Sequence, residues 1–130
     1  MRAMLLLCGL CGVAAADATL PIDGHVAGAS GKHVVHVCLW TAENFLDKPT
    51  RELTITPGAE LRFHFDVAPG RWAVSAYEDK NDNGTLDVGA FGPKEPNGFW
   101  RPFKAWRKPR FDDVDMTVGA AVPNAVVTLK

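Results

Sequence analysis

Apolar and polar residues alternate along much of this chain with a period of two, which is the period of a half-buried β-strand. The clearest run is 61–67, in which every second residue is apolar and the residues between are charged or polar. Its apolar members are Leu61, Phe63, Phe65 and Val67. The run at 34–40 is rich in β-branched residues and is predicted to be a strand, and 71–77 is apolar on both faces, which predicts a central strand.

Two later strands are predicted at 112–118 and 122–129, and weaker strand patterns occur at 22–26 and 53–56. A turn at Ala68-Pro69-Gly70 predicts that 61–67 and 71–77 pair as a hairpin. About seven short strands separated by turn residues predict an all-β fold, a single antiparallel β-sandwich of the immunoglobulin-like type.

The alternation stops between Gly89 and Phe111, where four prolines and several aromatic residues lie close together. A connection of this length is uncommon in a compact domain unless it has a function or is disordered. Because the aromatic side chains provide apolar surface to bury, we expect an ordered long loop that packs over one end of the sandwich.

The first residues have the layout of a cleaved signal peptide. Arg2 is basic, residues 5–13 are apolar, and three alanines at 14–16 provide a cleavage site. We therefore expect a signal peptide at 1–16, a single domain at 17–130, and a secreted or periplasmic protein.

Cysteine content and charge restrict the function only weakly. Cys8 and Cys11 lie in the predicted signal peptide, and each follows a leucine, which disfavours a lipid-attachment site. Cys38 remains in an apolar run, where we expect a buried, inert thiol. Loss of Arg2 from the 14 basic residues leaves 13 against 15 acidic ones, so nucleic-acid binding is disfavoured. No second apolar stretch is long enough for a transmembrane helix, and we expect a monomer.

Segment 79–87 has the spacing of a calcium-binding loop, with oxygen-bearing residues at alternate positions and Gly84 after the third of them. The predicted ligands are Asp79, Asn81, Asn83, the Thr85 carbonyl and Asp87. Ala90 stands where a bidentate glutamate is usual, so the expected affinity is weak, about 10⁻⁴–10⁻³ M. Glu95 is a candidate for the missing ligand. The alternative is a metal-free hairpin turn at Asn83-Gly84.

Other polar residues offer weaker candidates. The four histidines lack the spacing of a transition-metal site and are expected at the surface; they are His25, His33, His36 and His64. The sequence contains no Gly-x-Ser-x-Gly and no His-Glu-x-x-His motif. The acidic residues of 112–115 are expected to form a solvated face at a strand edge.

Segment 99–111 interleaves five aromatic residues with five cations. Rings beside cations can hold a sugar, an acidic glycan or lipid headgroups. The candidate ligand-binding residues are Trp100, Arg101, Phe103 and Trp106. The alternative is structural, with the rings covering one end of the sandwich and the basic stems lying along them.

Several blocks of the chain, roughly between residues 32 and 129, resemble domain-of-unknown-function family 2141, a bacterial family of secreted proteins. The blocks are Trp40 with Phe45-Leu46, Pro69-Gly70-Arg71-Trp72, Asp79 to Asp87, Gly92 to Phe99, and Pro109 to Asp113. The resemblance implies a transthyretin-like or prealbumin-like sandwich and no established activity. Glu78, Trp100-Arg101 and Arg107-Lys108-Pro109 depart from the family's usual pattern, so a ligand surface on the long loop can differ here.

These observations favour a non-enzymatic secreted or periplasmic module that binds an envelope protein or glycan, or has a structural role, with Ca²⁺ as a stabilising ion. One alternative is a small envelope glycan hydrolase that uses Glu95, Asp79 or Asp87 in a cleft with the aromatic residues. Another is an accessory subunit that docks on an envelope protein through 100–106.

Overall fold

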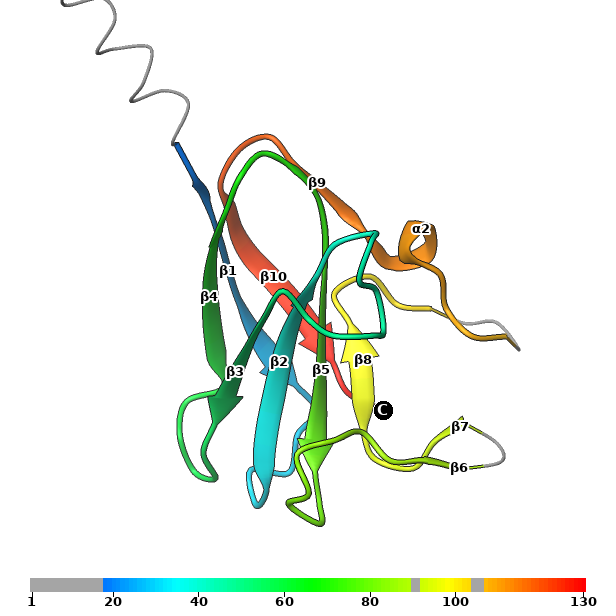
Figure 1. Ribbon diagram of the computed structural model, residues 1–130. Coiled ribbons are helices and arrows are strands. Elements are labelled where there is room, and N and C mark those ends of the chain that lie inside the picture. Colours follow the sequence, from blue (N-terminus) through cyan, green and yellow to red (C-terminus); the bar gives the residue numbers. More distant parts are fainter. Residues whose placement is uncertain (1–17, 90–91, 104–106) are drawn as a thin grey trace, which may run out of the picture.

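The computed structural model describes residues 18–89, 92–103 and 107–130, and the predicted signal peptide at 1–16 lies outside these residues. Two β-sheets pack face to face (Figure 1). The first sheet has the order β10-β1-β4, formed by β1 (Leu20–Ala27), β4 (Arg62–Val67) and β10 (Val122–Thr128). Within the described residues, no helix is long and apolar enough to cross a membrane.

The second sheet has the order β3-β2-β5-β8. Its strands are β2 (Val34–Trp40), β3 (Arg51–Ile55), β5 (Gly70–Asp79) and β8 (Asn97–Phe99). The first residues of β5 also pair with β9 (Met116–Val118). The predicted all-β sandwich is therefore confirmed.

One strand pair departs from the predicted antiparallel arrangement. β1 pairs with β4 in the antiparallel sense but with β10 in the parallel sense, and Ile22 lies opposite Val122. The alternation of apolar residues defines which face of a strand is buried, but it does not define the direction of the neighbouring strand.

The predicted hairpin of 61–67 and 71–77 is wrong, although both strands exist. β4 pairs with β1 in the first sheet, whereas β5 pairs with β2 in the second. Gly70, at a φ of 150°, begins the strand after the turn, and the chain passes from one sheet to the other there. The two strands therefore face each other across the core instead of lying side by side.

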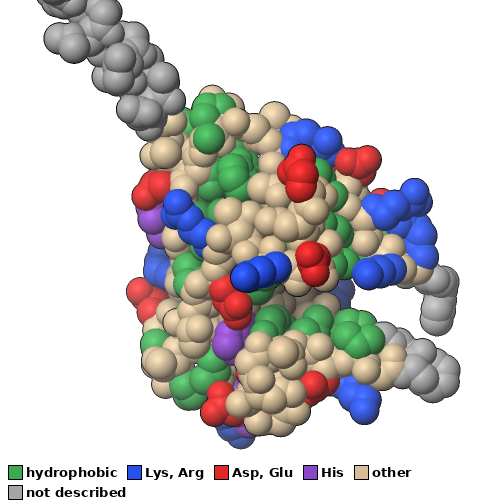
Figure 2. Space-filling model, viewed as in Figure 1, with side chains coloured by type: hydrophobic (Ala, Val, Ile, Leu, Met, Phe, Trp, Pro, Cys, Tyr) green, Lys and Arg blue, Asp and Glu red, His purple; other side chains and the backbone are tan. Residues whose placement is uncertain are grey.

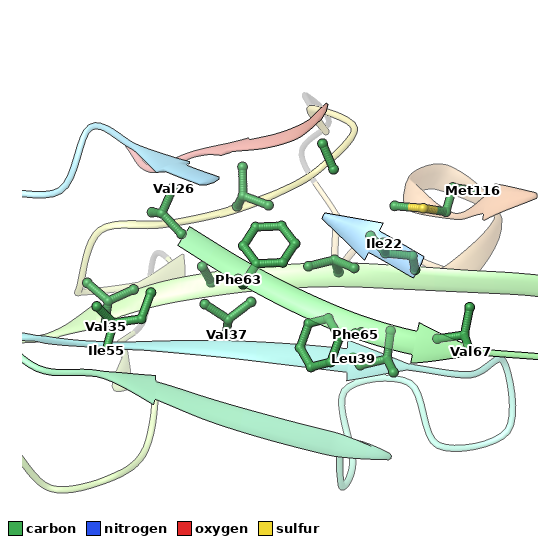
Figure 3. Packing of buried hydrophobic residues seen from close by; sticks show 14 of the residues in the cluster. Ile22, Val26, Val35, Val37, Leu39, Ile55, Phe63, Phe65, Val67 and Met116 are labelled. Carbon is green, nitrogen blue, oxygen red and sulfur yellow. The ribbon is translucent and has the colours of Figure 1, made fainter. Parts of the chain in front are cut away.

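The main core lies between the two sheets (Figure 3). The first sheet contributes Phe63, Phe65 and Ile22, and the second contributes Val37 and Val74, all at most 4% exposed. Each such side chain contributes about 1.5–3 kcal/mol when it is fully buried. The alternation in 61–67 predicted the inward-facing residues of β4 correctly.

The predicted long loop is ordered where it is described, but it is not a simple loop. β6 (Val88–Gly89) and β7 (Gly92–Pro93) form a short hairpin, and β8 joins the second sheet. The predicted strand at 112–118 is replaced at its start by a short helix, α2 (Phe111–Val114), because Phe111 and Val114 are three residues apart and both bury against the second sheet.

The structure gives a reason for the glycine at position 98, which lies in β8 and in the 92–99 block that resembles the family. A Cβ at this position would lie 2.1 Å from the carbonyl oxygen of Thr128 in β10. The backbones of Asn97 and Lys130 exchange two hydrogen bonds beside it, at 3.1 and 3.2 Å. Only glycine allows β8 to approach the end of β10 this closely.

Candidate functional site

A second apolar cluster covers the outer face of the second sheet. Its buried members include Trp40 and Tyr77 on the strands and Phe111 in α2. Phe45 packs against this cluster with its ring nearly perpendicular to that of Trp40, at 5.9 Å between centroids. The outer face of this sheet is therefore aromatic, whereas an exposed sheet face is usually polar.

A cleft of about 1360 Å³ opens over this face. One wall is the hairpin arm, which we define as residues 84–89 with 92–94, and the other is the basic arm, residues 100–103 with 107–110. Both arms project from the same side of the sandwich (Figure 1), and the space-filling view shows the hollow between them (Figure 2). Apolar side chains that stay partly or fully exposed line the walls; they are Leu46, Leu86, Val88, Phe99 and Phe103.

Several polar side chains in the cleft already bind other parts of the protein. The indole N–H of Trp40 donates to Ser75 Oγ at 2.8 Å, and the hydroxyl of Tyr77 donates to the carbonyl of Gly84 at 3.0 Å. Burial raises the pKa of Tyr77 above its usual range, so this hydroxyl stays a donor. The amide of Asn97 donates to the carbonyl of Glu95 at 2.9 Å.

Cys38 also lies on the cleft floor, and it is 5% exposed. Burial, together with the charge of Glu52, raises the pKa of its thiol to about 12, although a hydrogen bond with Ser75 opposes this rise. A thiol at neutral pH is a poor nucleophile when its pKa is this high. The predicted burial of Cys38 is confirmed, and its inertness stays a prediction.

The predicted calcium loop begins beneath the hairpin arm, at the end of β5. The side chain of Asp79 is fully buried. Its carboxylate accepts hydrogen bonds from the backbone N–H groups of Asn83 at 3.2 Å and Gly84 at 2.7 Å. His36 Nε2 lies 3.1 Å from the same carboxylate. Burial raises the pKa of Asp79, but these hydrogen bonds outweigh it and hold the pKa below its ordinary value.

The other predicted side-chain ligands meet at the open side of this loop. The amide groups of Asn81 and Asn83 donate to the carboxylate of Asp87 at 2.5 and 2.8 Å. Thr85 is exposed, and its backbone N–H donates to Asn83 Oδ1 at 3.1 Å. Among the described residues, no group of three or more histidine, cysteine, aspartate or glutamate side chains could hold a metal ion. Ca²⁺ binding through the asparagines and carbonyls stays a prediction.

Glu95 folds back onto this loop. It is 6% exposed, and its two carboxylate oxygens accept the N–H groups of Lys80 at 2.7 Å and Asp87 at 3.1 Å. The carboxylate thus connects the start and the end of the 80–87 segment. Its predicted role as an ion ligand stays a prediction.

Two further buried groups were missed by sequence reasoning. Glu78 is 1% exposed and binds the N–H and hydroxyl of Ser30; burial raises the pKa of Glu78, but these bonds lower it below its usual range. His36 was expected at the surface, but it is buried. Its ring stacks on Tyr77, and its Nδ1 lies 2.8 Å from Glu52 in a contact too poorly directed to be a hydrogen bond.

Some cations of the basic arm are already paired with carboxylates of the protein. Arg107 binds both carboxylate oxygens of Asp113, at 2.8 and 3.1 Å, and its guanidinium lies over the ring of Phe103. The Arg107 side chain and the backbone N–H of Arg110 hold the pKa of Asp113 at about 2. The acidic residues near α2 are therefore partners of these cations, and Asp113 is only partly exposed.

The predicted ligand-binding residues occupy different environments. Phe103 lines the cleft, whereas Arg101 binds the backbone carbonyl groups of Asp112 and Asp113. Trp100 lines the cleft with part of its surface and packs against the main core with another part. Trp106 lies outside the described residues.

The acids of the alternative glycan-hydrolase hypothesis do not meet in the cleft. Within the described residues, the acidic side chains that line it are Asp47 and Glu52, and none of Asp79, Asp87 and Glu95 does. The arrangement that this alternative requires is therefore not found in the described part of the chain.

Comparison with known proteins identifies the family to which the chain belongs. Residues 24–125 match the model of a family described as an uncharacterized protein conserved in bacteria, DUF2141. No curated protein and no solved structure matches the chain. The matched range contains the 79–87 loop, both arms and the strands that form the cleft floor. The chain therefore belongs to this bacterial family, domain-of-unknown-function family 2141.

Proposed function

We propose that the protein is a secreted or periplasmic binding module, not an enzyme, and that its ligand lies in the cleft between the hairpin arm and the basic arm. The observation that carries this proposal is the large, mostly apolar cleft on the outer face of a sheet. Val88 on its wall is 67% exposed. Apolar surface left open in a concave site is typical of binding sites.

The location rests on the predicted signal peptide at 1–16. Ca²⁺ is proposed as a stabilising ion in the loop that supports the hairpin arm, because Asn81, Asn83 and Asp87 meet there. Binding through the asparagine oxygens requires both amide groups to rotate by half a turn. The ion would then bind oxygen atoms, which Ca²⁺ prefers.

Site-specific photo-crosslinking in cells tests the binding site. A crosslinking amino acid at Val88 is expected to give a discrete adduct, and the same group at Glu60, an exposed residue in the β3–β4 connection, is expected to give none. Phe103→Ser in the same cleft should remove the Val88 adduct. Equal adducts from both positions, or a Val88 adduct that Phe103→Ser leaves unchanged, would contradict the proposed site.

A further inference from the structure

We infer that the cleft holds an apolar segment of another polypeptide, and that this segment carries carboxylates where it passes the basic arm. The inference rests on the proposed function and specifies its ligand.

The chemistry of the walls favours a polypeptide over a glycan. A sugar has hydroxyl groups around its ring, and each loses hydrogen bonds to water on binding unless the protein replaces them. Ser75, Tyr77 and Asn97 already bind groups within the protein. The partly exposed residues Leu46, Leu86, Phe99 and Phe103 and the exposed Val88 give the walls an apolar surface. An apolar segment that makes few side-chain hydrogen bonds fits these walls better.

The size of the cleft points in the same direction. Pockets for small molecules are about 300–1000 Å³ and largely enclose their ligands. This cleft is about 1360 Å³ and opens between two projecting arms. An extended chain can pass between the arms and contact both walls.

The charges near the basic arm define the second part of the inference. Arg107 is paired with Asp113, but Lys108 beside it in the cleft lining has no carboxylate within salt-bridge distance among the described residues, and neither has Arg110 at the end of the arm, outside the lining. Asp47 and Glu52 line the cleft from the β2–β3 connection and β3. A carboxylate in the occupant is therefore favoured where it passes Lys108 on the basic arm.

Binding of three probes to the mature protein tests the inference. The first is a short peptide of valine and phenylalanine flanked by glutamates, the second has the same core flanked by lysines, and the third is an oligomer of N-acetylglucosamine. Binding is followed by fluorescence anisotropy and by amide shifts of Leu86 and Phe99 on the two sides of the cleft. The glutamate-flanked peptide is expected to bind tightest and to weaken as salt rises.

Charge reversal makes the test specific. Lys108→Glu combined with Arg110→Glu should weaken the glutamate-flanked peptide about tenfold and reverse the preference toward the lysine-flanked one. Lys32→Glu, an exposed residue in the β1–β2 connection, is the matched control and should change binding less than about twofold. Both variants alter exposed side chains and should therefore fold normally. Melting curves that match the parent's verify this.

The other outcomes separate the inference from the proposed function. Equal binding of both peptides at all salt concentrations overturns the role of the charges. Binding of the sugar oligomer without either peptide overturns the polypeptide inference and leaves the cleft as a binding site. If no probe shifts Leu86 or Phe99 and Val88 gives no adduct, the inference and the proposed function both fail.

Discussion

Glu95→Gln is expected to destabilise the fold and to loosen the loop beneath the hairpin arm. The substitution keeps the size of the side chain but removes its charge. One oxygen can still accept a hydrogen bond from Lys80 or Asp87, but the new amide N–H₂ group must face the other backbone N–H. The variant therefore loses one bond to a charged acceptor and leaves a buried donor without a partner.

The magnitude follows from these two losses. A hydrogen bond to a charged group contributes about 1.5–3 kcal/mol, and an unsatisfied buried donor costs about 1–3 kcal/mol. Because Glu95 is only 6% exposed, water compensates little. We expect a loss of roughly 2.5–6 kcal/mol, a large part of the 5–15 kcal/mol that holds a domain folded.

Urea unfolding measures the loss, and amide hydrogen exchange locates it. Exchange of the Lys80 and Asp87 amides should become faster than that of amides in β2, because only the former lose their acceptor. Glu43→Gln is the control, since Glu43 is exposed and makes no side-chain hydrogen bond with a described residue. If Glu95→Gln stays within about 0.5 kcal/mol of the parent and both amides keep their protection, the carboxylate does not hold this loop.

Four other changes test the fold and the loop. Phe63→Ala should cost about 3–5 kcal/mol in urea unfolding, and a smaller cost would contradict its place in the core. Gly98→Ala should destabilise strongly, because its Cβ would lie 2.1 Å from a carbonyl oxygen; an unchanged melting temperature would contradict this close approach. At a Kd near 10⁻⁴ M, 10 mM Ca²⁺ should stabilise the protein by about 2.7 kcal/mol. Asp87→Ala removes the carboxylate that meets Asn81 and Asn83 and should abolish this gain, whereas Asp82→Ala should keep it. A melting curve unaffected by Ca²⁺ would favour the metal-free turn. Hydrogen bonds to two aspartates raise the pKa of His64. Its contribution to stability is therefore full below about pH 6.5 and is lost as the pH rises through the raised pKa. His64→Gln should lower the free energy of unfolding more at about pH 5.5 than at about pH 8.5, and an equal loss at both would exclude this linkage.

Local patterns predicted the strands well but their partners poorly. The alternation of 61–67 identified Phe63 and Phe65 as core residues, because burial of one face is a property of that segment alone. It could not show that β4 pairs with β1, since the pairing depends on a strand forty residues away. Phe111 and Val114 fit either a strand edge or a helical turn, and contacts with the second sheet decide between them.

The candidate site was predicted in part for the same reason. The spacing from Asp79 to Asp87 is local, so the turn and the role of Gly84 could be anticipated. The burial of Glu95 and His36 depends on partners distant in sequence, which single residues do not reveal. The cleft was not predicted, because it forms only when the two arms project on the same side of the sheet.

The parallel pairing of β1 with β10 affects how the chain can fold as it is made. Ile22 pairs with Val122, about a hundred residues later, and contacts this distant in sequence form slowly. Before 122–128 has emerged from the ribosome, β1 has a neighbour on one edge only. A nascent chain therefore keeps apolar strands accessible until its last strand arrives, and it is open to aggregation for most of its synthesis.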